Sequence, residues 1–254
     1  MAQQSAAQAQ QAAALPLFYR KPFALQARVH SEISLKRNAN FRFALNTNAI
    51  PLTTAEFYHA QRDYPIVFTA EAVPLPVAVV GIKDAVNLFV QPDGTWRRGA
   101  YVPAYVRRYP FLFAEQPDTK DLTLCIDEAS DLIEATKDNP FFKDGASTEI
   151  TKKALDFCIA YQRNFEAARE FGRTLAQVEL LVARDARVTV GPNETIVVRG
   201  FKMIDEEKFN QLPADAFLEW RTKGWIALIY AHLLSLGSWD KLVQIYHERQ
   251  AAPG

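Results

Sequence analysis

The stretch covering residues 99–130 reads GAYVPAYVRRYPFLFAEQPDTKDLTLCIDEAS, and the expected fold of the whole chain can be built outward from it. Pro103 and Pro110 bracket a segment that has room for only a single short turn of helix, which is the conformation we expect there. The apolar run Leu122–Ile126 predicts a strand that ends at an Asp-Glu pair. The stretch therefore places aromatic, basic and acidic side chains between a helical turn and a strand.

Short apolar segments dominate the first half of the chain, and amphipathic segments dominate the second. Strands are expected over residues 30–35, 41–45, 66–72 and 77–82, with hairpins at 87–98 and 188–198. Helices are expected from residue 53, behind a capping box, to before Pro65, and over residues 147–182 with a bend or break at Gly172, 205–212, 214–236 and 238–250. This order predicts an α+β fold, in which a mostly antiparallel sheet from the N-terminal half is backed by long helices from the C-terminal half.

The composition limits the classes of partner that the protein could bind. Lys and Arg together number 29 among 254 residues, as do Asp and Glu, so the net charge of zero argues against nucleic acid as a partner. No apolar run approaches the roughly 20 residues that a membrane span requires. Residues 1–15 form an Ala/Gln tail that we expect to be disordered, and residues 16–250 are expected to form one domain. Because the tail lacks the features of a secretory signal, we expect a cytoplasmic protein.

The sequence offers none of the common motifs that hold a cofactor. Its 10 glycines are not clustered as a phosphate-binding loop or a dinucleotide fingerprint needs, and no serine has a nucleophile elbow around it. We therefore predict no cofactor. Cys125 and Cys158 lie among apolar neighbours, which is typical of buried free thiols.

The best candidates for ligand recognition are Arg107, Arg108, Tyr109 and Asp127. Guanidinium groups bind carboxylates or phosphates through paired hydrogen bonds, and a neighbouring aromatic ring can stack on the ligand. Alternatively, one arginine pairs with Asp127 or Glu128 and serves only the fold. Asp127 could also act as an acid or base, or cap a following helix, but adjacent residues of a strand face opposite sides.

His30 and Glu32 are the nearest approach to a metal-binding motif. If both lay on one strand they would share a face, and His232 or His247 could complete a site for iron. A His-x-Glu sequence such as that at residues 30–32 is also common by chance on strands that face solvent. We favour the interpretation that His30 and Glu32 are ordinary polar residues of this kind, so no metal site is predicted.

The segment 214–236 is apolar on more than one side of the predicted helix. A helix of this kind either lies at the centre of the core or forms an interface with a partner. If the segment forms an interface, the partner could be a second copy of the chain, which would make the protein a homo-oligomer.

Two strings in the opening stretch, YVPAYVRRYPF at 101–111 and LCIDEAS at 124–130, resemble the SapC family of bacterial proteins. The apolar helix around Trp225 and the segment YAHL at 230–233 resemble that family as well. The resemblance covers roughly residues 17–250. The family is named after a protein associated with a paracrystalline surface layer, and the resemblance supplies no catalytic residues.

Three hypotheses about function follow. The first is a SapC-like cytoplasmic accessory or binding protein, linked to surface-layer or envelope functions, that recognises a peptide, a small anionic ligand or a protein partner. The second is an enzyme of unassigned chemistry, such as a metal-dependent oxygenase that uses His30 and Glu32. The third is a structural subunit that oligomerises through the segment 214–236.

Overall fold

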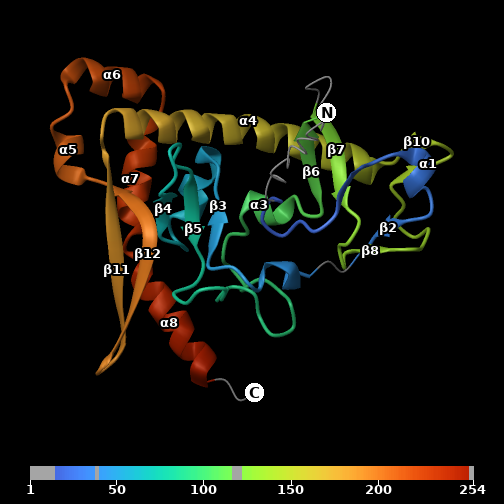
Figure 1. The fold of residues 1–254 in the computed structure, drawn as a ribbon, viewed down its shortest axis with the longest axis horizontal. Coiled ribbons are helices and arrows are strands. Elements are labelled where there is room, and N and C mark those ends of the chain that lie inside the picture. Colours follow the sequence, from blue (N-terminus) through green and yellow to red (C-terminus); the bar gives the residue numbers. More distant parts are fainter. Residues whose placement is uncertain (1–14, 38–39, 116–121, 252–254) are drawn as a thin grey trace, which may run out of the picture.

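A computed structural model describes residues 15–37, 40–115 and 122–251, and its largest sheet has five antiparallel strands (Figure 1). The spatial order of the strands is β11 (Leu181–Gly191), β12 (Glu194–Ile204), β4 (Ile66–Thr69), β5 (Pro76–Val79) and β3 (Ala49–Pro51). The β11–β12 hairpin is much longer than the other strands and projects beyond them (Figure 1). The predicted α+β fold is confirmed, but the second half of the chain contributes the two longest strands as well as the long helices.

A second sheet contains the strand that follows the Arg-Arg pair. Its order is β1 (Pro22–Ala24), β7 (Leu122–Asp127) and β6 (Phe111–Glu115), all antiparallel. Two small ladders pair β2 (Ser34–Leu35) with β8 (Ile133–Glu134) and β9 (Phe142–Lys143) with β10 (Ala146–Ser147). The expected strand at 122–126 is thus confirmed, whereas the expected strand at 30–35 is reduced to its last two residues.

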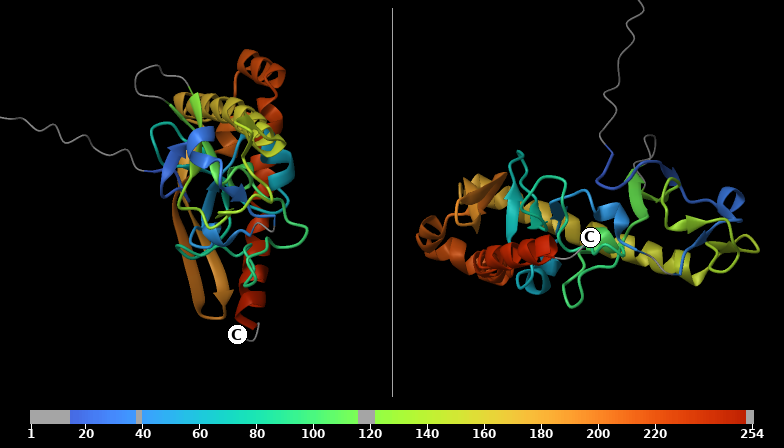
Figure 2. Two further views of the ribbon diagram at one scale, coloured as in Figure 1. Left: turned by 90° about the vertical axis from the view of Figure 1, so that its right-hand side faces the viewer. Right: turned by 90° about the horizontal axis from the view of Figure 1, so that it is seen from below.

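Helix α4 (Glu149–Gln177) runs along the molecule above both larger sheets and joins their two regions (Figures 1 and 2). The helix is continuous at Gly172, so the expected break there does not occur. A Cβ atom at this position would lie 1.8 Å from the carbonyl oxygen of Pro74, so glycine allows the loop after β4 to pack directly on the helix. The helix ends at Gln177, earlier than expected, because Glu179 adopts a positive φ of 55° and β11 begins at Leu181.

The segment 214–236 is two helices rather than one. Helix α6 (Ala214–Thr222) and helix α7 (Trp225–Ser235) meet at Gly224, whose φ of 73° favours glycine and ends the first helix. Asp205 caps α5 (Glu206–Asn210) by accepting hydrogen bonds from the amides of Glu207 and Lys208. Helix α8 (Ser238–Ala251) begins directly after α7, close to where the sequence predicts it.

The first half contains short helical turns where strands and longer helices were expected. Residues 41–45 were expected as a strand but contain the 3-10 turn η1 (Arg42–Ala44), and the expected hairpin at 87–98 keeps one bridge, Val90 to Trp96. The capping box is confirmed and starts η2 (Thr54–Glu56), which continues as α2 (Phe57–Ala60). The remaining turns are α1 (Ala27–His30) and α3 (Ala104–Arg107), the latter being the expected turn between two prolines.

Apolar side chains form one large buried cluster, to which the five-stranded sheet and helices α4, α7 and α8 contribute, and a smaller one around Phe111, Ile126, Phe141 and Cys158. Both cysteines are buried and free, as expected. Across the described ranges, no helix combines the length and the apolar character needed to cross a membrane.

His232 joins α7 to the sheet through both of its ring nitrogens. Its Nε2 accepts a hydrogen bond from the amide of Ile204 at 3.1 Å, and its Nδ1 lies 2.7 Å from the carbonyl oxygen of Ile66. The ring is fully buried, and this burial lowers the pKa of His232 to about 4. The imidazole is therefore neutral at pH 7 and links β12 to β4 through one side chain.

This burial predicts a pH dependence of stability. The unfolded chain protonates His232 near its ordinary pKa of 6.5, but the folded protein does so only near 4, so the free energy of unfolding falls as pH decreases between these values. The expected loss is about 3 kcal/mol over that window, at 1.36 kcal/mol per pKa unit. Urea unfolding at pH 4 to 7 measures it, and His232→Gln should flatten this dependence.

His247→Gln is the matched control, because His247 is exposed on α8 and its replacement should leave the pH dependence unchanged. Equal slopes for wild type and His232→Gln would contradict the assignment of this dependence to His232.

Candidate functional site

The carboxylate of Glu56 organises the region around the Arg-Arg pair. Its side chain is buried, and its Oε2 accepts hydrogen bonds from the amide and the hydroxyl of Thr53, at 2.8 and 2.9 Å. Its Oε1 accepts from the amide of Ala104 at 2.6 Å and from the hydroxyl of Tyr101 at 3.1 Å. All four favourable acceptor positions are therefore used, and the carboxylate fixes α3 and the Tyr101 ring relative to η2.

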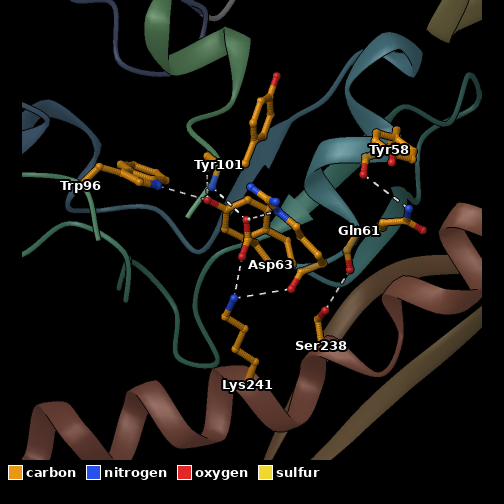
Figure 3. A network of polar contacts seen from close by, with 9 residues as sticks. Tyr58, Gln61, Asp63, Trp96, Tyr101, Ser238 and Lys241 are labelled. Atoms are coloured by element: carbon orange, nitrogen blue, oxygen red, sulfur yellow. Dashed lines mark hydrogen bonds and ion pairs between the residues drawn. The ribbon is translucent and has the colours of Figure 1, made fainter. Parts of the chain in front are cut away.

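A network centred on Asp63 holds the chain segment that carries Tyr101 (Figure 3). The buried Asp63 accepts a hydrogen bond from the amide of Tyr101 at 2.8 Å and forms an ion pair with Lys241 of α8. The hydroxyl of Tyr64 donates to the carbonyl oxygen of Tyr101 and accepts from Trp96 Nε1. Tyr101 is thus fixed through its amide, its carbonyl and its side chain, because each group has a buried partner.

Arg107, at the end of α3, is exposed and lies beside these fixed groups. Its Nε donates to the carbonyl oxygen of Val102 at 3.0 Å and its Nη2 to the Tyr101 hydroxyl at 3.1 Å. The guanidinium lies 5.2 Å from the centre of the Phe157 ring and 5.7 Å from that of Tyr101. Within the described residues, no carboxylate approaches Arg107 to within 4 Å.

A cavity of about 170 Å³ opens between η2, α3 and α4 next to Arg107. Glu56, Tyr101 and Arg107 line one side of it, and residues of α4 line the other, namely Phe157, Ala160, Tyr161 and Asn164. Burial, reinforced by Glu56, raises the pKa of Tyr101 to about 12, so this hydroxyl keeps its proton at pH 7.

Tyr161 is one of the residues that line this cavity, and its hydroxyl forms no hydrogen bond within the described residues. The residue is 4% exposed, and its hydroxyl oxygen is buried with no hydrogen-bond partner in the part of the chain that the structure describes. Burial also raises the pKa of Tyr161, which keeps the proton on the oxygen. An unsatisfied buried hydroxyl costs about 1–3 kcal/mol, so a ligand that supplied an acceptor would recover this energy.

Arg108 has a different environment from that of Arg107. Its guanidinium lies between the rings of Tyr105 and Tyr161, at 4.2 and 4.4 Å from their centres, with Tyr19 at 5.5 Å. Such contacts with ring faces stabilise a desolvated cation. Arg108 therefore supports the wall that carries Tyr161, and it is not among the residues that line the cavity.

Asp127 and Tyr109 belong to the packing of the second sheet. The fully buried Asp127 accepts hydrogen bonds from the amides of Arg20, Lys21 and Ala129 and from the Tyr109 hydroxyl, the last at 2.9 Å. The Tyr109 ring stacks on Phe43 at 4.1 Å. Asp127 thus anchors the chain before β1, and the alternative in which it pairs with the Arg-Arg segment is not formed.

Of the four predicted ligand-binding residues, Arg107 lines this cavity, whereas Arg108, Tyr109 and Asp127 are not among its lining residues. Glu56, Phe157 and Tyr161 were missed, although the capping box gave a signal for Glu56. Nothing in the local sequence of α4 distinguishes Phe157 and Tyr161 from other apolar positions on its buried face.

The His30 and Glu32 pair does not form a metal site. His30 ends helix α1, with Nδ1 3.1 Å from the backbone of Gln26 and Nε2 3.4 Å from Glu128. Glu32 lies in the turn that follows and pairs with Lys137 at 3.2 Å. The expected shared strand face does not exist, and no group of three potential ligands among His, Cys, Asp and Glu occurs in the described ranges.

These features define an α+β protein with a small cavity beside an unneutralised arginine. In a comparison with protein families, the family model described as SapC matches residues 25–242, which is most of the chain. The chain belongs to the SapC family. Neither the curated proteins nor the solved structures contain a match to it.

The unused hydroxyl of Tyr161 predicts an unusual mutational response. Tyr161→Phe should leave the free energy of unfolding unchanged or raise it by about 1 kcal/mol, because it removes a buried polar group that has no partner. Tyr105→Phe is the matched control, because the Tyr105 hydroxyl donates to the carbonyl oxygen of Leu17 at 3.1 Å and its loss should destabilise by about 1 kcal/mol. Urea unfolding of both variants at pH 7 distinguishes the two responses, and a destabilised Tyr161→Phe protein would contradict the assignment.

Proposed function

We propose that this SapC-family protein is a binding protein that recognises a carboxylate group, and that Arg107 holds it. The observation that carries the proposal is the pairing of an exposed guanidinium, without a carboxylate partner in the described residues, with an adjacent cavity. Tyr161, whose buried hydroxyl has no hydrogen-bond partner in the described residues, is one of the residues that line this cavity. A carboxylate supplies acceptors to both groups at once.

The state of Arg107 supports this function. Two of its five N–H donors bond to Val102 and Tyr101, which fixes the guanidinium, and its other donors have no hydrogen-bond partner within the described residues. Flanking aromatic rings limit its motion further. Binding therefore requires little ordering of the side chain, which favours affinity.

The size of the cavity limits the ligand class. At about 170 Å³, the cavity is smaller than the roughly 300–1,000 Å³ that drug-sized ligands and cofactors occupy. It suits a small carboxylic acid or the C-terminal residue of a peptide. Both offer the same carboxylate, and they differ in whether the rest of the ligand continues outside the cavity.

Membership of the family supports the wider setting that we propose. We place the protein in the cytoplasm as an accessory factor for surface-layer or envelope functions, with the carboxylate belonging to a peptide, a small anion or a protein partner. Fractionation of cells that express the tagged full-length chain tests the location, and recovery in the extracellular fraction would contradict it.

Binding is tested by native mass spectrometry of the gently purified full-length protein, followed by calorimetric titration. The probes are succinate and the peptide acetyl-Ala-Ala-Ala with either a free or an amidated C-terminus. At least one free carboxylate should bind, the amidated peptide should bind much more weakly, and Arg107→Ala should lower the affinity roughly tenfold to hundredfold. Tyr161→Phe should also weaken binding.

Arg98→Ala is the control, because Arg98 is an exposed arginine outside the cavity. It should bind like wild type. If Arg107→Ala lowers the free energy of unfolding by several kcal/mol, Arg107 is structural and the proposal fails. Equal binding of the free and the amidated peptides would also contradict it.

A second candidate function, self-association as a structural subunit, is favoured by the exposed face of α6 and α7. Leu218, Tyr230 and Leu234 are 56%, 47% and 72% exposed, and Phe217 and Tyr230 contact the same ring, that of Phe209. Exposed apolar side chains that gather in this way are typical of an interface.

If this face mediates self-association, Leu234→Glu should produce a monomer while leaving the melting temperature within about 2 °C of wild type, because its side chain lies mostly in solvent. Analytical ultracentrifugation over a hundredfold dilution measures the oligomeric state. Lys223→Glu, outside the apolar face, is the control, and a wild-type protein that is monomeric at all concentrations would exclude this candidate.

A further inference from the structure

A second hollow lies far along the chain from the Arg107 cavity, between strand β11 and helix α8. Its volume is about 630 Å³. Figures 1 and 2 both show α8 running alongside the β11–β12 hairpin, and the two elements are in contact. The wall formed by α8 and its approach carries Leu236, Trp239 and Val243, and Met203 of β12 completes the apolar part. We call this hollow the β11 groove.

One wall of the β11 groove is the open edge of the sheet. Strand β11 is the last in the spatial order of the five-stranded sheet, and it pairs on one side with β12. No hydrogen bond within the described ranges satisfies the backbone groups of Ala183–Val190 on the other side. An unpaired edge of this length is a template for a further strand.

The residues that line the groove show that it follows β11. All six consecutive residues 184–189 contribute to the lining. Because successive side chains of a strand point to opposite faces, a lining that includes every residue involves the main chain of β11 as well as its side chains. After the irregularity between Arg184 and Ala186, the pairing of β11 with β12 is regular from Ala186 to Thr189, which leaves a straight stretch of edge.

The charges on the β11 wall of the groove favour carboxylates on the side of an occupant that faces β11. Arg184 and Arg187 line this wall, and no carboxylate of the described residues lies within 4 Å of either guanidinium. The opposite wall carries one carboxylate, that of Asp240 on α8, beside the apolar side chains of Trp239 and Val243. Asp185 is already paired with Arg199 of β12 at 3.5 Å. An occupant with carboxylates on the side facing β11 would therefore complement the two arginines.

We propose that the β11 groove binds an extended, acidic peptide segment of a partner protein, which adds to β11 as a sixth strand of the sheet. Its backbone pairs with the edge at residues 186–189, its apolar side chains contact Trp239 and Val243, and its acidic side chains meet Arg184 and Arg187. Main-chain pairing supplies affinity, and the alternate side chains supply specificity. This site is independent of the Arg107 cavity.

The test is selection of peptides from a displayed library of random octamers on the full-length protein. We expect enriched sequences to alternate apolar and acidic residues and to protect β11 from amide hydrogen exchange. Arg187→Glu and Val243→Glu should each weaken the selected peptides at least tenfold. Arg173→Glu, on the exposed surface of α4, is the matched control and should bind like wild type.

Synthetic versions of the best peptide, N-methylated at either the odd or the even positions, test the strand pairing directly. One pattern blocks the N–H groups that would face β11, and the other blocks those that face solvent, so one version should lose binding and the other should keep it. Three results would overturn the proposal: equal binding of both versions, no peptide enriched over the Arg187→Glu protein, or binding lost in Arg107→Ala. It also fails if Arg187→Glu converts a wild-type dimer into monomers, since the edge is then occupied by a second copy.

Discussion

The buried carboxylate of Glu56 is the contact on which the candidate site depends. It accepts four hydrogen bonds from two segments that lie about 45 residues apart in the sequence, and it leaves no acceptor position free for a ligand. A buried charge is stable only when it is satisfied in this way. Because Glu56 fixes the Tyr101 ring and the start of α3, the position of Arg107 follows from it. Asp63 has the same role on the other side of Tyr101, where it links the segment to α8.

Helix α4 extends this arrangement across the molecule. The same helix contacts η2 and β6, so it joins the region of the five-stranded sheet to that of the second sheet. Gly172 allows its close approach to Pro74 at one end, and Tyr161 packs against Arg108 and Tyr105 nearer the other. The residues of α4 that line the cavity therefore belong to the helix that joins the two sheet regions. The packing of this helix holds Tyr161 in place even though its hydroxyl has no hydrogen-bond partner in the described residues.

The sequence predicted those elements whose signals are local. The capping box at Thr53, the cap at Asp205 and the apolar period of α4 depend on residues three or four apart, and the structure contains all three. The strand expected at 30–35 and the single helix expected over 214–236 failed for tertiary reasons. His30 is drawn into a helical turn against Glu128, and Gly224 adopts a left-handed conformation that reverses the chain. The pairing of β12 with β4, which joins the two halves in one sheet, joins residues more than 130 positions apart and has no local signature.

The different environments of Arg107 and Arg108 show why the candidate ligand site could be only partly predicted from the sequence. Arg107 is the last residue of α3 and Arg108 is its C-cap. Because successive residues of a helix point about 100° apart, the two side chains leave the chain in different directions. The guanidinium of Arg108 lies between tyrosine rings, which take the place of water around it but carry no negative charge. The guanidinium of Arg107 remains at the surface beside the cavity. Aromatic faces stabilise the partly buried guanidinium of Arg108 on two sides, and here Tyr105 comes from α3 itself but Tyr161 comes from α4. The contact of Arg108 with Tyr161 thus joins α4 to the end of α3, and the cavity beside Arg107 is lined by residues of the same two helices.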